Sequence, residues 1–207
     1  MIFLLDTSDD FKTAASEVKG MEVGQLITPL TGRKNVGEPH KFAIDNGAFA
    51  DFDAKRFRAI LDREKKNRDR CLFVCAPDMV GSGRLTLALW RQWEGYLATW
   101  KRALVLQDGI EDLDIPWEQL EAVFVGGTDR FKTSDAALQI CKAAKMMPDP
   151  KWVHVGRVNT AIRLDRWMDV ADSADGTGVS RYSHMRGSLT SGLPLMEAAH
   201  AGDATGV

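Results

Sequence analysis

The chain has few of the residues that hold small proteins together through disulfides or metal ions. Its 207 residues include three cysteines, Cys71, Cys75 and Cys141, and four histidines. The cysteines are too few and too scattered for a disulfide framework, and no cysteine or histidine cluster has the spacing of a zinc site. We therefore expect no metal, no cofactor and a reduced, cytoplasmic setting in which the cysteines pack as small hydrophobic residues.

Long apolar runs and an excess of charge are also missing. No stretch approaches the roughly 20 apolar residues that span a bilayer, and the first apolar run is too short for a signal peptide and ends at Asp6. The formal net charge is −2. We expect a soluble protein with no membrane partner, in which any contact with nucleic acid comes from a local basic patch.

Short apolar runs alternate with helix-like segments along the chain. The runs have the length and the Val, Ile, Leu and Phe content of buried parallel strands. They cover 2–5, 25–29, 42–45, 71–75, 103–107, 122–125, 152–155 and, more weakly, 174–179. Amphipathic or capped helices are expected over 9–18, 53–70, 84–100, 134–147, 159–170 and 191–201, with Ser8 and Asn159 as helix caps.

This alternation predicts an α/β protein built from parallel βα units. Eight strands favour a compact, closed (β/α)8 barrel of the TIM type, although such barrels typically have ~250 residues and ~200 is near their lower limit. An open, doubly wound sheet is the alternative. No linker or repeat divides the chain, so we expect a single domain over 1–207, with a mobile tail from about Gly187.

Acidic, amide or glycine residues follow five of the predicted strands. These are Asp45 with Asn46, Asp78, Gln107, Gly126 with Gly127, and Asp175. Each has an ordinary explanation, because Asp, Asn and Gly commonly form turns where strands end. In a parallel barrel, however, all strand ends of one kind meet at the C-terminal mouth, where the chemistry of such barrels takes place.

As a set, these residues suit the exchange of a base at an N-glycosidic bond. Asp175 could attack the sugar C1′ to form a covalent aspartyl–glycosyl intermediate, and Asp45 could move protons. Asp78, Gln107, Asn46 and the amides of Gly126 and Gly127 could hold the departing and entering bases, because a carboxylate accepts two bonds from adjacent donors. Asp172, which we expect at the end of the preceding helix, is the competing carboxylate for the role of Asp175.

In this order, the residues resemble the tRNA-guanine transglycosylase superfamily. Residues 44–49 are similar to the family's Asp-Ser-Gly-Gly-Phe/Tyr segment, 106–109 to its Val-Gln-Gly-Gly segment and 125–127 to its Gly-Gly-Leu-Ala segment. Asp78 and Asp175 fall near the family's base-binding and nucleophilic aspartates. The resemblance covers about 42–181 and implies that Asp45 is the general acid/base and that Gln107 binds the base.

The chain departs from the tRNA enzymes in two ways. The family's Cys-X-Cys-X-X-Cys run with a histidine does not follow Asp175, since the last cysteine is Cys141, and the chain is much shorter. The resemblance therefore points to the small phage- and island-associated DNA branch, the DpdA type. It implies a pentosyltransferase that exchanges guanine in DNA for a free 7-deazaguanine such as preQ0.

Basic and aromatic residues near Asp175 are candidates for binding the nucleic acid. They are Arg181, Tyr182, His184 and Arg186, with Arg157 from a neighbouring loop. A base inside a duplex is out of reach, so we expect a single strand or a flipped guanine. His154 lies between valines, and we expect it to be a buried structural residue.

Other functions stay open at this point. The substrate could be tRNA or a free nucleoside, or the protein could be a phosphodiesterase or a sugar hydrolase. A different class is a nucleic-acid-binding barrel without activity. Homodimer formation and accessory modification proteins are likewise left open.

Overall fold

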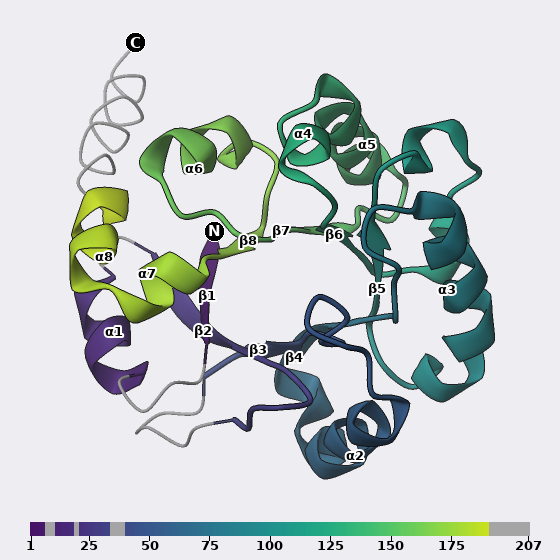
Figure 1. The fold of residues 1–207 in the computed structure, drawn as a ribbon, viewed down its shortest axis with the longest axis horizontal. Helices are drawn as coiled ribbons and strands as arrows, with labels where there is room; N and C mark the ends of the chain where they lie inside the picture. Colours follow the sequence, from purple (N-terminus) through teal and green to yellow (C-terminus); the bar gives the residue numbers. More distant parts are fainter. Residues whose placement is uncertain (7–10, 19–20, 34–39, 191–207) are drawn as a thin grey trace, which may run out of the picture.

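A computed structural model of the chain describes residues 1–6, 11–18, 21–33 and 40–190. Its eight strands pair in parallel in chain order, and β1 also pairs with β8, where Ile2 lies opposite Ser173. The sheet is therefore a closed barrel, as predicted, and not an open doubly wound sheet (Figure 1). The strands are β1 (Ile2–Asp6), β2 (Glu22–Ile27), β3 (Phe42–Ile44), β4 (Cys71–Cys75), β5 (Arg102–Leu106), β6 (Ala122–Val125), β7 (Trp152–Val155) and β8 (Ser173–Asp175).

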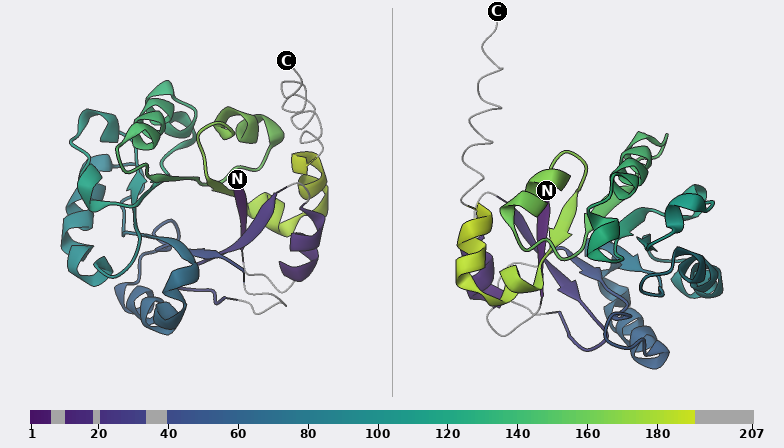
Figure 2. Two further views of the ribbon diagram at one scale, coloured as in Figure 1. Left: turned by 180° about the vertical axis from the view of Figure 1, so that it is seen from behind. Right: turned by 45° about the horizontal axis from the view of Figure 1, so that its top comes forward.

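Helices surround this barrel on the outside (Figures 1 and 2). They are α1 (Phe11–Glu17), α2 (Ala54–Glu64), α3 (Gly83–Leu97), α4 (Asp129–Lys132), α5 (Asp135–Met146), α6 (Ala161–Trp167), α7 (Thr177–Arg181) and α8 (Ser183–Thr190). Side-chain oxygens of Asp53, Ser82 and Ser134 accept backbone N–H bonds at the starts of α2, α3 and α5. No helix in the described residues is long and apolar enough to cross a bilayer.

The barrel closes with about 200 residues because several of its connections are short. The segment between β5 and β6 holds only the 3₁₀ turns η2 (Ile110–Asp112) and η3 (Trp117–Gln119). Another 3₁₀ segment, η1 (Lys65–Arg70), ends the connection from α2 to β4. Helix α6, between β7 and β8, has only seven residues. A chain of about 200 residues therefore suffices for a closed barrel, because some connections are short while all eight strands are kept.

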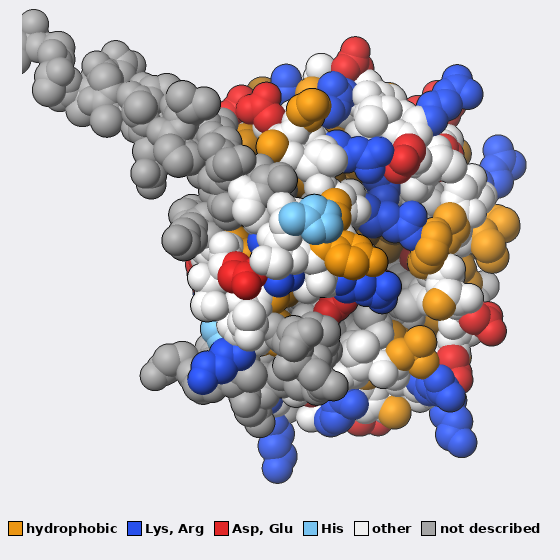
Figure 3. Space-filling model, turned by 60° about the vertical axis from the view of Figure 1, so that its left-hand side comes forward, with side chains coloured by type: hydrophobic (Ala, Val, Ile, Leu, Met, Phe, Trp, Pro, Cys, Tyr) orange, Lys and Arg blue, Asp and Glu red, His pale blue; other side chains and the backbone are white. Residues whose placement is uncertain are grey.

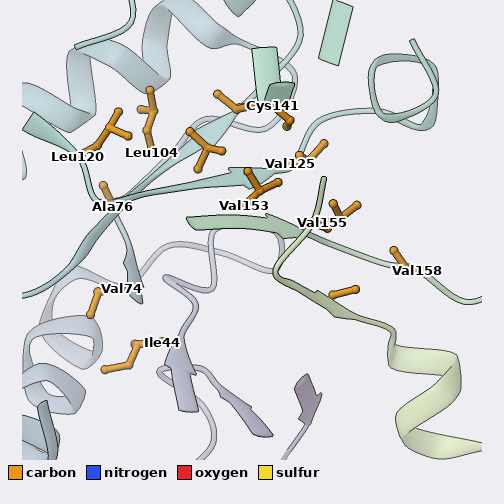
Figure 4. Close-up of a cluster of buried hydrophobic side chains, with 14 of the residues drawn as sticks. Ile44, Val74, Ala76, Leu104, Leu120, Val125, Cys141, Val153, Val155 and Val158 are labelled. Atoms are coloured by element: carbon orange, nitrogen blue, oxygen red, sulfur yellow. The ribbon is translucent and has the colours of Figure 1, made fainter. Parts of the chain in front are cut away.

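The strands separate two hydrophobic layers. Leu4, Phe73, Cys75, Ala103 and Val105 point into the barrel and form its inner cluster. Their neighbours along the same strands point outward and pack against the helices, as Figure 4 shows for side chains that include Val74, Leu104 and Val153. This alternation is the two-residue period of a β-strand, and in a parallel barrel it makes both faces apolar.

Some of the predicted helix details are wrong. Helix α6 is capped by the Thr160 side chain, and Asn159 instead accepts a hydrogen bond from Gly178 N at 2.9 Å. Some apolar side chains of the predicted helices point to solvent: Ile162 is 86% exposed, and Leu85 and Tyr96 of α3 are also exposed. The buried face of α3 instead includes Leu87, Trp90, Trp93 and Leu97.

The C-terminal part of the described chain also differs from expectation. Strand β8 ends at Asp175, and α7 takes up residues that were expected to continue the strand. Gly187, the expected start of a mobile tail, lies within α8. The expected helix over 191–201, with the rest of the expected tail, lies outside the described residues. Ser8, the expected cap of the helix over 9–18, lies outside them as well.

A buried arginine joins this last segment to the start of the chain. Arg186 on α8 is 5% exposed and forms an ion pair with Glu17 at the end of α1. Its Nη1 also donates to the carbonyl oxygens of Val179 and Ser180 at 3.0 and 3.1 Å. Arg186 therefore stabilises the packing of α7 and α8 on α1 and does not face a nucleic acid, contrary to the sequence-based assignment.

We predict that Arg186→Ala destabilises the protein, because the two buried carbonyl groups lose their donor. The expected loss of unfolding free energy is about 1–3 kcal/mol, measured by urea denaturation. Arg181→Ala, at an exposed arginine on the neighbouring helix, is the matched control and should change stability by no more than about 0.5 kcal/mol. Equal stability of the two variants would contradict the structural role of Arg186.

Candidate active site

A cavity of about 500 Å³ opens at the C-terminal end of the barrel. Every strand contributes to its lining at or just after its last residue. These residues are Asp6, Thr28, Asp45, Asp78, Gln107, Gly126, Gly156 and Asp175. The cavity therefore lies at the C-terminal mouth of the barrel, where the candidate residues were predicted to meet.

The alternation of the strands explains why these particular residues face the cavity. Ile44, Leu106 and Val125 belong to the outer hydrophobic layer. The next residue in each strand, Asp45, Gln107 or Gly126, therefore points inward. On β8 the outward residue is Ala174, and Asp175 follows it into the cavity. The structure brings the predicted catalytic and base-binding residues together.

Asp78 lies at the centre of a network of buried amides. Asn46 Nδ2 donates to its Oδ1 at 2.7 Å, and Gln107 Nε2 donates to its Oδ2 at 2.6 Å. Burial raises the pKa of the Asp78 carboxyl above its usual value, and these two hydrogen bonds act in the opposite direction. Each carboxylate oxygen has a second lone pair, so Asp78 can still accept two further N–H bonds.

The two amides are themselves held in place. Asn46 Nδ2 also donates to the Ala76 carbonyl, and Asn46 Oδ1 accepts from Ala48 N. Gln107 is 2% exposed, and its Oε1 accepts from Gly81 N at 2.8 Å. Gln107 is therefore a buried residue of the cavity wall and not a solvent-exposed residue at the end of a strand. Its second Nε2 hydrogen is available for a carbonyl group of a ligand.

The glycine pair has a more limited role than predicted. Gly126 N donates to the Leu106 carbonyl at 3.1 Å, so this amide is already used within the barrel. A Cβ at Gly126 would lie 2.7 Å from Val105 and 3.0 Å from Gln107 Nε2, which explains why a glycine fits here. Gly127 adopts a φ of +76°. Of the two backbone amides, only that of Gly127 lacks a hydrogen bond to a described residue.

Asp45 has the electrostatics of an acid/base group that works near neutral pH. Burial raises the pKa of its carboxyl from an ordinary value of 3.8 to about 6. The hydrogen bond from Gly47 N to Oδ1, at 3.0 Å, lowers this pKa, whereas the nearby Asp175 and Asp78 carboxylates raise it. A general acid or base is most effective when its pKa is close to the working pH.

A chain of hydrogen bonds inside the barrel orients Asp175. Trp152 Nε1 donates to Ser173 Oγ at 2.8 Å, and Ser173 Oγ lies 2.8 Å from His154 Nδ1. His154 Nε2 in turn lies 3.0 Å from Asp175 Oδ2. Because the indole only donates, the Ser173 hydroxyl can give its proton to Nδ1, and His154 then carries its hydrogen on Nε2 and donates it to the carboxylate.

His154 is the main residue whose role sequence reasoning missed. It is fully buried and packs against the rings of Phe124 and Phe73, at centroid distances of 4.6 and 5.1 Å. The predicted burial is correct, but one of its partners is the candidate nucleophile. The available signal was the alternation of Trp152 and His154 on β7 next to Ser173 and Asp175 on β8.

Asp172 is not an alternative to Asp175. Both of its carboxylate oxygens lie 2.8 Å from Lys145 Nζ, and Oδ2 also accepts from Val153 N. This carboxylate joins α5 to the start of β8, away from the residues that line the cavity. Asp175, with 8% exposure, is the carboxylate of β8 that faces the cavity.

Positive charge lines one side of the cavity. Arg157, Arg181 and the buried Lys132 all contribute to its wall. Tyr182 and His184 are exposed beside them, with ring centroids 5.7 Å apart. Figure 3 shows Lys, Arg and hydrophobic side chains lying close together on one face of the molecule. Four of the five predicted nucleic-acid contacts are thus exposed or line the cavity, and Arg186 is not.

Among the described residues, no group of three or more His, Cys, Asp and Glu side chains could hold an ion. Cys71, Cys75 and Cys141 are buried free thiols, and burial raises the pKa of Cys71 and of Cys141 to about 12.

No family model and no curated protein matches the chain. Among solved structures, it is similar to a designed cube-shaped, porous protein cage made by fusing symmetric oligomeric domains, with 13% identity over 97% of this chain and 73% of that one (TM-score 0.49). The native KDPGal structure shares 14% identity over 95% of both chains (TM-score 0.42). CdNal from Clostridium difficile, in complex with mannosamine, shares 12% sequence identity over 78% of this chain and 55% of that one (TM-score 0.41). None of these names a transglycosylase, so that resemblance stays a prediction.

We predict that Asp45→Asn stabilises the protein more at pH 8 than at pH 5. Because the native pKa is raised, the native state binds the proton more tightly than the unfolded state, and this stabilisation is lost as the pH rises through about 6. Removing the charge should therefore give an extra gain of about 1 kcal/mol at the higher pH, measured by urea denaturation. Asp69→Asn, at an exposed carboxylate, should give the same effect at both pH values. An equal gain in unfolding free energy from Asp45→Asn at pH 5 and pH 8 would contradict a raised pKa of Asp45.

Proposed function

We propose that this protein is an enzyme that exchanges guanine in DNA for a 7-deazaguanine base through a covalent bond to Asp175. The observation that carries this proposal is the meeting of three carboxylates in one cavity, each in a different setting. Asp78 is bound by two amides, Asp45 has a pKa of about 6, and Asp175 is oriented by a histidine. Different settings allow chemically identical groups to take different roles.

The Asp78 side of the cavity suits a planar, hydrogen-bonding base. The free lone pairs of Asp78 accept from adjacent N–H groups such as those of a guanine edge, and the remaining Gln107 Nε2 hydrogen donates to a ring carbonyl. Gly127 N offers a further donor at the same rim. Because Asn46 and Gln107 are already bonded, the acceptors are oriented before the base binds, which reduces the entropy cost of binding.

The two oxygens of Asp175 are not equivalent. Oδ2 accepts the His154 bond at 3.0 Å, whereas Oδ1 has only a long bond of 3.3 Å from Arg157 N. Oδ1 is therefore the oxygen that attacks C1′, and Oδ2 becomes the ester carbonyl with His154 still donating to it. When the ester breaks, this N–H stabilises the returning negative charge.

Asp45 balances the protons in both steps. As Oδ1 bonds to C1′, the bond from C1′ to the base nitrogen breaks, its electron pair leaves with guanine, and protonated Asp45 supplies the proton. The incoming 7-deazaguanine then gives its N–H proton to the Asp45 carboxylate while its nitrogen displaces Oδ1 from C1′. A pKa of about 6 lets this group act in both directions near neutral pH.

We predict that Asp175→Ala abolishes exchange, because no covalent intermediate can form. The assay incubates the protein with labelled guanine and either single-stranded DNA or tRNA, and follows incorporation into the polymer and the mass of a trapped protein–nucleic acid complex. The wild type should label DNA, and the variant should lose at least about 1,000-fold in rate. Nucleoside mass spectrometry of DNA from cells that express the chain with a preQ0 supply identifies the inserted base.

Asp169→Ala, at an exposed carboxylate outside the cavity, is the matched control and should keep full activity. Full exchange by Asp175→Ala would overturn the assignment of the nucleophile. Labelling of tRNA alone would assign the same chemistry to the other polymer. Release of guanine without incorporation would identify a hydrolase, and binding of DNA without either reaction would identify a non-catalytic barrel.

We predict that His154→Phe slows the breakdown of the covalent intermediate, because the ester loses its N–H donor while an aromatic ring still fills the space between Phe73 and Phe124. Loss of a hydrogen bond to a developing charge corresponds to about 10- to 100-fold in rate. His154→Gln, which retains an N–H, should restore part of that loss. The readout is the decay of the trapped complex after a 7-deazaguanine is added. Unchanged decay in both variants would show that His154 serves packing alone.

A further inference from the structure

Lys132, the last residue of α4, is a buried cation that the proposed chemistry does not use. It is 8% exposed and lines the cavity, but no hydrogen bond or salt bridge joins its Nζ to any residue in the part of the chain that the structure describes. Burial lowers the pKa of this amine below its usual value, Arg157 lowers it further, and the Asp175 and Asp129 carboxylates act in the opposite direction. A buried ammonium without a partner is costly, so a residue of this kind indicates a site that an anion completes.

Arg157 supplies a second positive charge to the same wall. It follows β7 with a φ of 64°, the only positive φ among the described non-glycine residues. Its guanidinium carbon lies 3.5 Å from the centroid of the exposed Phe49 ring, which fixes the head group at the mouth. No carboxylate of the described residues forms an ion pair with it, whereas the neighbouring Arg163 pairs with Asp129 at 3.0 Å.

The position of these cations relative to Asp175 limits what the anion can be. Arg157 N donates to Asp175 Oδ1, the oxygen that attacks the sugar, and the Asp175 charge also acts on Lys132. The amides that bind Asp78 and suit a base follow β3 and β5, whereas Arg157 follows β7 and Lys132 ends the short helix after β6. An anion held by Lys132 and Arg157 is therefore close to the sugar that Asp175 attacks. In a nucleotide, the group with that placement is a phosphate.

We infer that Lys132 and Arg157 form a subsite for the phosphodiester next to the sugar that Asp175 attacks. A lysine offers a point charge and an arginine a planar fork, and together they can hold two oxygens of one phosphate group. This inference deepens the proposed function and rests on it for the identity of the sugar. It implies that the enzyme selects a nucleotide within a strand over a free nucleoside, which has no phosphate to bind.

The test combines a change in the protein with a change in the substrate. Short single-stranded oligonucleotides with one guanine carry either natural phosphodiesters or an uncharged methylphosphonate on the 5′ or the 3′ side of that guanine. For the wild type, one of the two replacements should lower kcat/KM about 10- to 100-fold. For Lys132→Met the natural oligonucleotide should show a loss of similar size, and the methylphosphonate should cause little further loss, because the same contact is already gone.

The controls separate this contact from general effects of charge and folding. Lys142→Met removes an exposed lysine on α5 and should respond to the methylphosphonate as the wild type does. Lys132→Arg, which retains a cation, should recover part of the activity and of the methylphosphonate effect. Lys132→Met should fold, because it replaces an unpaired buried charge with an apolar chain of similar length.

Binding of the same fluorescent oligonucleotides, measured by anisotropy, tests the subsite without any reaction. The methylphosphonate and Lys132→Met should each weaken binding, and together they should weaken it little more than either alone. If binding shows this pattern but no base is exchanged, the subsite is supported and the proposed function is wrong. If bases are exchanged but neither methylphosphonate affects the wild type, or the full effect persists in Lys132→Met, the subsite is overturned. Borohydride reduction with pyruvate that adds mass to the wild type but not to Lys132→Met would assign imine chemistry to this amine and would also overturn it.

Discussion

The two-residue alternation of the barrel strands is the constraint on which the whole site depends. When Ile44, Leu106, Val125 and Ala174 pack outward against the helices, the residue after each must face the cavity. Closure of the barrel between β1 and β8 then brings these positions within one ring. A shift of one residue in any of these strands would exchange its polar end with a core residue, so packing and site geometry are specified together.

Closing three carboxylates into one cavity creates an electrostatic problem that the surrounding residues solve differently for each. Two side-chain amides donate to Asp78, burial raises the pKa of Asp45 although backbone N–H groups lower it, and His154 contacts one oxygen of Asp175. Lys132 and Arg157, which follow β6 and β7, add positive charge to the same lining. The cavity thus combines hydrogen-bond acceptors with cations. The proposed substrate, a nucleotide, carries a hydrogen-bonding base and a negatively charged phosphate.

The sequence allowed the barrel and most of the cavity to be predicted, because both follow from local patterns. The strands over Cys71–Cys75, Ala122–Val125 and Trp152–Val155 were predicted to the residue. Local sequence patterns did not predict which residue each polar side chain contacts in the folded protein. Arg186 and Arg181 are both basic residues close to Asp175 in the chain, yet one is buried against Glu17 and the other faces the mouth. His154 gains its role only from the register that places it beside Ser173.

The position of Lys132 depends on a short helix that precedes the main helix of its βα unit. Helix α4 has four residues, and the twelve-residue α5 follows it before β7. A helix of four residues rises only about 6 Å, so the last residue of α4 is still close to the end of β6 and can reach the cavity. By contrast, Lys145 near the end of α5 pairs with Asp172 at the start of β8, away from the cavity lining. The extra turn of helix therefore lets Lys132 join the residues that follow the strands, and it adds a cation to the wall that Asp175 and Arg157 also line.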